Sequence, residues 1–180
     1  MSENMLLEKI KKLSPKEKKE LVKNIGQSAF QNEAKYGGCA QSTLAAFQQH
    51  LGVDDAILFK AVTGLAGGMG LTGESVCGGV CGAAIAIGLV YGRENFESEQ
   101  GFTQTLNLCG ILSDRFAEQY GSYKCHDVQK IVLGRAYDMR DPEDLAKVNA
   151  IPNVHDYCGK VCQKAAEIAT ELILEAAESE

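Results

Sequence analysis

Seven cysteines are the residues of this chain with the clearest chemical potential. They are Cys39, Cys77, Cys81, Cys109, Cys125, Cys158 and Cys162. Thiolates bind zinc, iron and iron–sulfur clusters, and they also exchange with disulfides. The N-terminal segment carries charges inside its apolar run and has no small-residue cleavage site, so we expect no signal peptide and a cytoplasmic protein. In a reducing compartment, many cysteines favour metal, cluster or redox chemistry over a disulfide scaffold.

Two cysteine pairs have the spacing of one helical turn. Cys77 and Cys81 are four residues apart, and so are Cys158 and Cys162. On a helix each pair shares a face, where it could supply two ligands or cycle between dithiol and disulfide. Neither pair is the CxxC of a thioredoxin-type site or a zinc ribbon. Cys109 follows an apolar helical stripe, and we expect it only to pack in the core.

Three cysteines fall near the expected starts of helices. Cys39 follows a Gly-Gly pair, Cys125 comes shortly after a glycine and a serine, and Cys158 begins the last helix. The positive end of a helix dipole lowers the pKa of a thiol and favours the thiolate. Backbone N–H groups at such positions can also point at sulfur, as they do around iron–sulfur clusters. The recurrence therefore predicts a cluster site.

The elements that must position these cysteines are almost all helical. Ser14, Pro15 and Glu17 form the pattern of a capping box that begins a helix. The expected helices cover residues 15–34, 39–51, a segment capped by Asp54 or Asp55, 75–91, 96–120, a short stretch after 122, and 154–177. Residues 130–133 (KIVL) are the best strand candidate, and residues 134–152 look irregular with one or two helical turns. We predict an all-α, single-domain helical bundle.

Residues 75–92 lack any charge, which borders on the length of a membrane span. Five glycines and two cysteines in this run, with no second span and no flanking basic cluster, argue against one. We expect a central, buried, glycine-rich helix instead. Gly78, Gly82 and Ala86 would form a smooth stripe that lets another backbone or a cofactor approach, or that packs across a homodimer interface.

Several function classes are excluded. The net charge of −6 makes nucleic acid an unexpected partner. The turn GLAGGMG has neither the βαβ setting of a dinucleotide site nor the Gly-Lys-Ser/Thr of a Walker loop. Ser122 replaces the first cysteine of a CxxCH motif, so we expect no covalent haem. The three histidines are dispersed, and no acid–base constellation decides whether the protein is an enzyme.

A known family contains the same motifs in the same order. They are GGCAQSTLAAF around Cys39, GLAGGMGLTGESVCGGVCGA through Cys77, GSYKCHDV with Cys125, GRAYDMRDPED, and DYCGKVCQKAAEI with Cys158. Over roughly residues 30–175 the chain resembles the redox-active C_GCAxxG_C_C proteins, which share sequence with the non-haem part of split-Soret cytochromes. It departs from the pattern at Gly79, where alanine is usual, and in having Cys81, Cys109 and Cys162 as additions.

The resemblance implies a helical fold and a redox role. Its four matched cysteines, Cys39, Cys77, Cys125 and Cys158, would be the ligands of a [2Fe–2S] or [4Fe–4S] cluster, with Cys81 and Cys162 as alternative ligands or resolving thiols. We expect one helical domain over residues 1–180, made of an N-terminal helical extension (1–30) and a four-cysteine redox core (31–177). The leading function is electron transfer to an unidentified redox partner protein, without membrane attachment.

Three alternatives remain open at this point. The first is thiol–disulfide chemistry by Cys77/Cys81 or Cys158/Cys162. The second is a structural zinc module, in which four cysteines close the helices. The third is a plain helical scaffold with buried cysteines.

Overall fold

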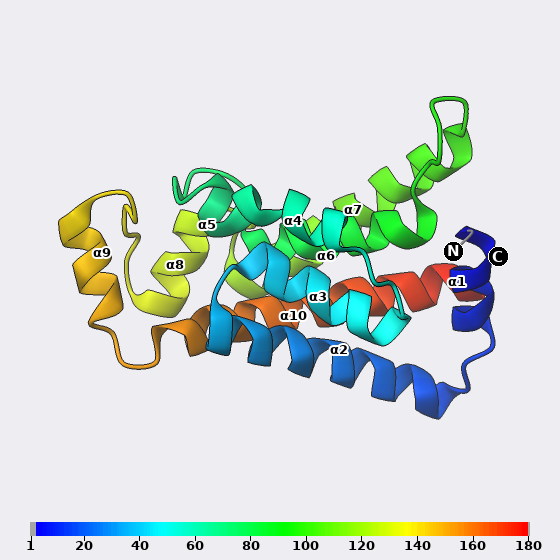
Figure 1. Cartoon of the computed structure of the whole chain (residues 1–180), viewed down its shortest axis with the longest axis horizontal. Coiled ribbons are helices and arrows are strands. Elements are labelled where there is room, and N and C mark those ends of the chain that lie inside the picture. Colours follow the sequence, from blue (N-terminus) through cyan, green and yellow to red (C-terminus); the bar gives the residue numbers. More distant parts are fainter. Residues whose placement is uncertain (1–2, 180) are drawn as a thin grey trace.

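The chain folds as a bundle of helices, as predicted from its sequence (Figure 1). The computed structural model describes residues 3–179, so Met1, Ser2 and Glu180 of the predicted domain lie outside it. The helices are α1 (Glu3–Lys11), α2 (Pro15–Tyr36), α3 (Cys39–Leu51), α4 (Ala56–Ala61), α5 (Ala66–Met69), α6 (Gly78–Tyr91), α7 (Glu99–Tyr120), α8 (Cys125–Leu133), α9 (Pro142–Asn149) and α10 (Val154–Glu178). Residues 3–179 contain no sheet, only one antiparallel bridge between Val76 and Lys124.

The long helices α2 and α10 run side by side along the molecule (Figure 1). The predicted capping box starts α2: the Ser14 hydroxyl accepts the Glu17 N–H at 3.4 Å, and the Glu17 carboxylate accepts the Ser14 N–H at 2.8 Å. Gly26 lies against the Glu167 side chain of α10, where a Cβ atom would come within 2.7 Å of Cγ. The absence of a side chain there lets the two helices approach closely. The α2 helix also crosses the expected boundary at residue 30 without a break.

The glycine-rich helix α6 lies at the centre of the bundle, as the sequence predicts. A Cβ atom on Gly82 would come within 2.5 Å of the Ala40 carbonyl oxygen and 2.9 Å of the Thr43 Cβ, so this face packs on the backbone of α3. Gly79 faces Cys162 and Ala165 of α10 in the same way. The smooth stripe is therefore filled within the chain. Among the described residues, no helix is long and apolar enough to cross a membrane.

At the end of the bundle near α1, large apolar side chains fill the interior. Phe47 and Leu112 are fully buried. Leu6 and Ile10 of α1 cover this end. Close packing of this kind makes these helices a rigid frame.

The opposite end is built from short elements and differs from the sequence prediction in two places. Residues 130–133, the strand candidate, form the last turn of α8. The residues before them, Val128 and Gln129, are buried on one face of the same helix. The α6 helix begins at Gly78, so Cys77 is its N-cap residue with extended ψ, not a helical residue. The expected turns in the irregular segment form α9, whose N-cap Asp141 accepts the N–H groups of Glu143 and Asp144.

Candidate functional site

Five of the seven cysteines line one cavity of about 250 Å³. They are the four predicted ligands and one additional residue: Cys39, Cys77, Cys125, Cys158 and Cys162. The predicted ligands come from four separate segments. Cys39 and Cys125 are the first residues of α3 and α8, Cys77 is the N-cap of α6, and Cys158 lies near the start of α10. The structure thus brings together residues that are up to 119 positions apart in the sequence.

A tight reversal between α2 and α3 delivers Cys39 to the cavity. Gly37 and Gly38 adopt φ values of 70° and 78°, which residues with a side chain rarely adopt. The Ser42 hydroxyl donates to the Gly37 carbonyl at 2.8 Å and so fixes the reversal. Beside it, the Ala40 and Gly67 N–H groups act on the Cys39 sulfur as hydrogen-bond donors.

Paired loop segments hold Cys77 and Cys125 next to each other. The Cys77 N–H donates to the Tyr123 carbonyl at 2.8 Å, and the Cys125 N–H donates to the Ser75 carbonyl at 3.0 Å. The glycine-rich turn makes room for this pairing, because a Cβ atom on Gly68 would come within 2.5 Å of the Cys125 Cβ. This turn therefore serves the cysteine site through positive-φ backbone, and not as a phosphate loop.

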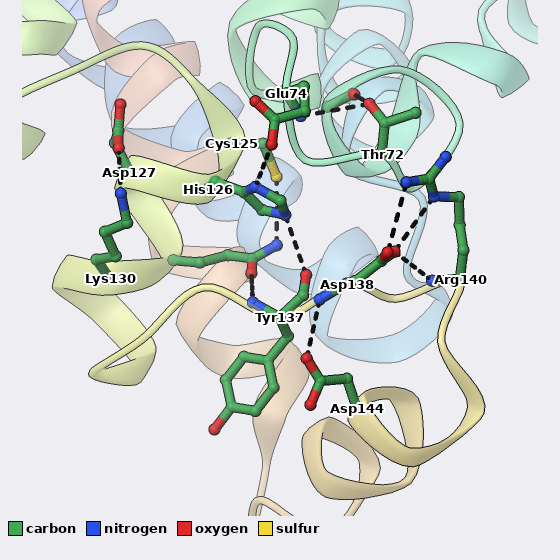
Figure 2. A network of polar contacts seen from close by, with 12 residues as sticks. Thr72, Glu74, Cys125, His126, Asp127, Lys130, Tyr137, Asp138, Arg140 and Asp144 are labelled. Atoms are coloured by element: carbon green, nitrogen blue, oxygen red, sulfur yellow. Dashed lines mark hydrogen bonds and ion pairs between the residues drawn. The ribbon is translucent and has the colours of Figure 1, made fainter.

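His126 and Gln129 fasten the segment after α8 over Cys125 (Figure 2). The His126 Nδ1 lies 3.1 Å from a Glu74 carboxylate oxygen, and its Nε2 lies 3.1 Å from the Tyr137 carbonyl. Both neighbouring atoms are oxygens that can accept a hydrogen bond from the ring. Gln129 donates to the Cys125 sulfur at 3.5 Å and accepts the Tyr137 N–H at 2.8 Å. An amide donor is thus placed beside the Cys125 sulfur.

The hydrogen bonds around the sulfurs differ from one cysteine to another, although the sulfurs of Cys81 and Cys162 also have hydrogen-bond donors beside them. The sulfurs of Cys39, Cys77 and Cys125 accept from N–H groups, that of Cys77 from Gly79. Cys158 has no such donor within residues 3–179. The thiols of the additional cysteines donate to carbonyl oxygens instead, at 3.7 to 3.9 Å: Cys81 to Val76, Cys109 to Ala84, and Cys162 to Cys39. A donating thiol keeps its proton, whereas an accepting sulfur suits a thiolate.

The predicted lowering of the Cys39 pKa by the helix dipole is wrong. Burial raises the pKa of this thiol to about 12, and burial also raises the pKa of Cys77, Cys158 and Cys162 far above the ordinary range. Desolvation and the neighbouring thiols outweigh the dipole and the N–H donors. Without a bound cation these thiols are protonated, so a metal must displace protons when it binds.

Glu33 is a functional candidate that the sequence reasoning missed. Its side chain lines the cavity from α2, the residue is only 4% exposed, and its Oε2 atom has no hydrogen-bond partner among residues 3–179. Burial raises the pKa of its carboxyl to about 7, against the effect of the Ser42 hydroxyl. The available signal was the four-residue spacing from Ile25 through Ala29 to Glu33, which continues the buried stripe of α2.

The remaining walls of the cavity are mostly apolar. Val128 and Val132 of α8, Leu145 and Val148 of α9, and Val161 of α10 face it. Helices α8 and α9 and the start of α10 lie at one end of the molecule (Figure 1). An apolar wall lowers the local dielectric and limits water around the sulfurs.

Cys81 and Cys109 stay outside the cavity. Cys77 lies before the first turn of α6, and its side chain lines the cavity, whereas that of Cys81 does not. The prediction that the two cysteines share a helical face is therefore wrong. Cys109 packs against the core, as expected. Within the described part of the chain, no three His, Cys, Asp or Glu side chains are close enough to hold a single metal ion. The five sulfurs surround a volume and do not converge on one point.

An all-helical bundle with cysteines around one internal cavity defines a class of thiol-based redox or metal proteins. A model of the family described as "Putative redox-active protein (C_GCAxxG_C_C)" matches residues 38–172, and the chain belongs to this family. All seven cysteines lie within the matched segment, whereas Glu33 precedes it. Neither the curated proteins nor the solved structures give a match.

Proposed function

We propose that the cavity holds an iron–sulfur cluster bound by Cys39, Cys77, Cys125 and Cys158, and that the protein transfers electrons through it. One observation carries this proposal: four segments distant in sequence each bring one of these sulfurs to the same cavity. When bound, such a cluster supplies reversible one-electron chemistry.

The residues around the sulfurs fit such a group. N–H donors act on three of the four sulfurs, and donors of this kind are one means by which proteins set a cluster's potential. Sulfurs that surround a volume suit a polynuclear group, whose metal atoms are themselves spread out, better than one ion. Both [2Fe–2S] and [4Fe–4S] clusters take four thiolates. The structural zinc alternative gains no support from this arrangement.

Cluster assembly has a charge consequence that the site partly meets. Four buried thiols must lose their protons to become ligands, and their raised pKa values oppose this until iron is present. The Gln129 amide, which donates to the Cys125 sulfur, would stabilise part of the resulting negative charge. We also propose a cytoplasmic location, where Cys81 and Cys109 would stay reduced.

The test is anaerobic purification followed by an absorption spectrum and assays of iron and acid-labile sulfide. We expect a coloured protein containing both. Cys39→Ser and Cys125→Ser should lose the cluster, because each removes one of four ligands. Cys109→Ser is the matched control and should keep it, since this residue packs outside the cavity. A folded, colourless protein without iron and sulfide would refute the proposal.

Thiol–disulfide exchange is the second candidate, and the structure narrows its cysteine pair. Cys158 and Cys162 both line the cavity, whereas Cys81 does not. Oxidation would remove two electrons and two protons from this pair, pass the electrons to an external oxidant such as a peroxide, and form one S–S bond. The raised pKa values disfavour the attacking thiolate. A reversible mass loss of two hydrogens, mapped to this pair in metal-free protein, would support it.

A further inference from the structure

Glu33 presents an electrostatic problem that the protein itself does not solve. The residue is only 4% exposed, and its Oε2 atom is buried. The Oε2 atom has no partner within the described residues. A buried polar atom without a partner costs free energy, and a buried charge without one costs more. The group therefore needs a partner that the cavity can hold.

The neighbours of Glu33 show what kind of partner that is. On α3 it faces Cys39 and Ser42, and on α10 it faces Cys158 and Cys162, whose pKa values its charge raises. The described residues place no Lys or Arg side chain in an ion pair with it. His155 lines the cavity but has an exposed ring that lies against Gly37. A carboxylate among thiolates would be stable only next to a cation inside the cavity.

We propose that Glu33 supplies a fifth ligand, a carboxylate oxygen, to the metal group in addition to the four cysteine sulfurs, so that its ligation is mixed thiolate and carboxylate. This inference rests on the proposed function, because it assumes that a metal group is bound. Carboxylate oxygen is a harder ligand than thiolate and is well suited to iron. The Glu33 charge raises the pKa of Cys39 and of Cys158, and it is not among the causes of the raised pKa of Cys77 or Cys125. Glu33 would therefore bind the metal group on the α2–α10 side of the cavity.

The backbone around Glu33 is built to hold this side chain in place. The Glu33 carbonyl accepts the Gly37 N–H at 2.9 Å, which ties it to the reversal before Cys39. Asn32 donates to the Ser42 carbonyl at 3.2 Å and fastens the same turn of α2 to α3. Glu33 and Cys39 are therefore positioned by one set of hydrogen bonds. The Ser42 hydroxyl lies beside the carboxyl and donates its proton to the Gly37 carbonyl, within the same reversal.

The test uses the full-length, anaerobically purified protein labelled with ¹³C at the glutamate carboxyl carbons. Electron–nuclear double resonance of the reduced cluster should show a strong ¹³C coupling in the wild type. Glu33→Gln should abolish this coupling. Glu33→Asp, labelled at aspartate instead, should show the coupling at the new carboxylate. Glu20→Gln is the matched control, because this exposed residue of α2 pairs only with Lys16 at the surface.

Each outcome separates the two proposals. A wild-type cluster without ¹³C coupling overturns the ligand assignment and leaves the cluster proposal standing. A coupling that survives in Glu33→Gln also overturns it, since another glutamate would then be the ligand. A wild-type protein with neither iron nor sulfide overturns both. If Glu33→Gln does not fold, the aspartate variant decides, because its carboxylate either carries the coupling or does not.

Discussion

The two ends of the bundle use the same long helices for opposite purposes. Near α1, aromatic and aliphatic side chains fill the space between α3, α6, α7 and α10 completely. Near α9, the helices α2, α6 and α10 instead diverge around a cavity lined by thiols and one carboxyl group. The packed end contributes a frame. The cavity end buries polar groups among apolar side chains, and this burial costs free energy unless a ligand in the cavity binds them.

The cysteines follow the same division. Cys109 lies in the packed region and satisfies its thiol with a carbonyl oxygen at 3.9 Å. Cys39 and Cys77 lie at the cavity, where backbone N–H groups act on their sulfurs. The same residue type thus packs in the core in one region and lines the cavity in the other.

The largest expected effect concerns the packed end. Phe47→Ala removes a fully buried ring, and we expect the free energy of unfolding to fall by about 3–5 kcal/mol. Leu145→Ala, at the cavity wall, removes a side chain that is already 40% exposed and should cost well under about 2 kcal/mol. Urea denaturation of both variants measures the difference. Equal losses would mean that the cavity end is packed as tightly as the frame.

The second prediction concerns the pH dependence of the metal-free protein. In the folded state the Glu33 pKa is raised to about 7, so between its ordinary value of 4.5 and about 7 the folded protein binds more protons than the unfolded chain. Stability must therefore fall as the pH rises through this window, by up to about 3 kcal/mol. Glu33→Gln lacks the titrating group and should remove this decline.

Subtracting the two stability curves isolates the effect of Glu33. The lowered pKa of His50 acts in the opposite direction, but it is common to both proteins. The cysteine thiols ordinarily titrate near 9, so they contribute mainly above the window. Denaturation at a series of pH values from 5 to 8 supplies both curves. Parallel curves would show that the Glu33 carboxyl is not desolvated.

The sequence predicted the helices well because their signals are local. The capping box at Ser14 and the glycines before Cys39 mark helix ends within a few residues, and the structure confirms both. The KIVL segment misled because four apolar residues fit a strand or a helix equally well. Its helical state depends on Cys125 and Gln129, which face the cavity from the same helix.

The site was harder to predict because burial is a tertiary property. Motif order identified the four cysteines that meet at the cavity, but the helix-dipole reasoning gave the wrong direction for the Cys39 pKa. Desolvation by residues far away in the sequence decides that direction. Glu33 was assigned no place at the site because it continues an apolar stripe of α2, and a stripe does not reveal that it ends at a cavity.

The smallest effect tests how closely α3 approaches α6 where the packed frame gives way to the cavity. A Cβ atom on Gly78 would collide with the Cys39 sulfur and come within 3.1 Å of the Leu65 carbonyl oxygen. We therefore expect Gly78→Ala to cost about 1–3 kcal/mol and to displace the Cys39 sulfur. Gly88→Ala in the same helix meets nothing within 4 Å and should gain up to about 1 kcal/mol from helix propensity alone.

The two variants are matched controls, because each replaces a glycine of α6 with alanine. The expected changes in the free energy of unfolding nevertheless have opposite signs. Urea denaturation of the two metal-free variants measures the signs, and iron content after anaerobic purification measures the effect on the site. If Gly78→Ala also stabilised the protein, α3 and α6 would be further apart than the structure places them. Cys39 would then not be held against α6, and its sulfur would lose the fixed position that distinguishes the cavity thiols from a packed cysteine such as Cys109.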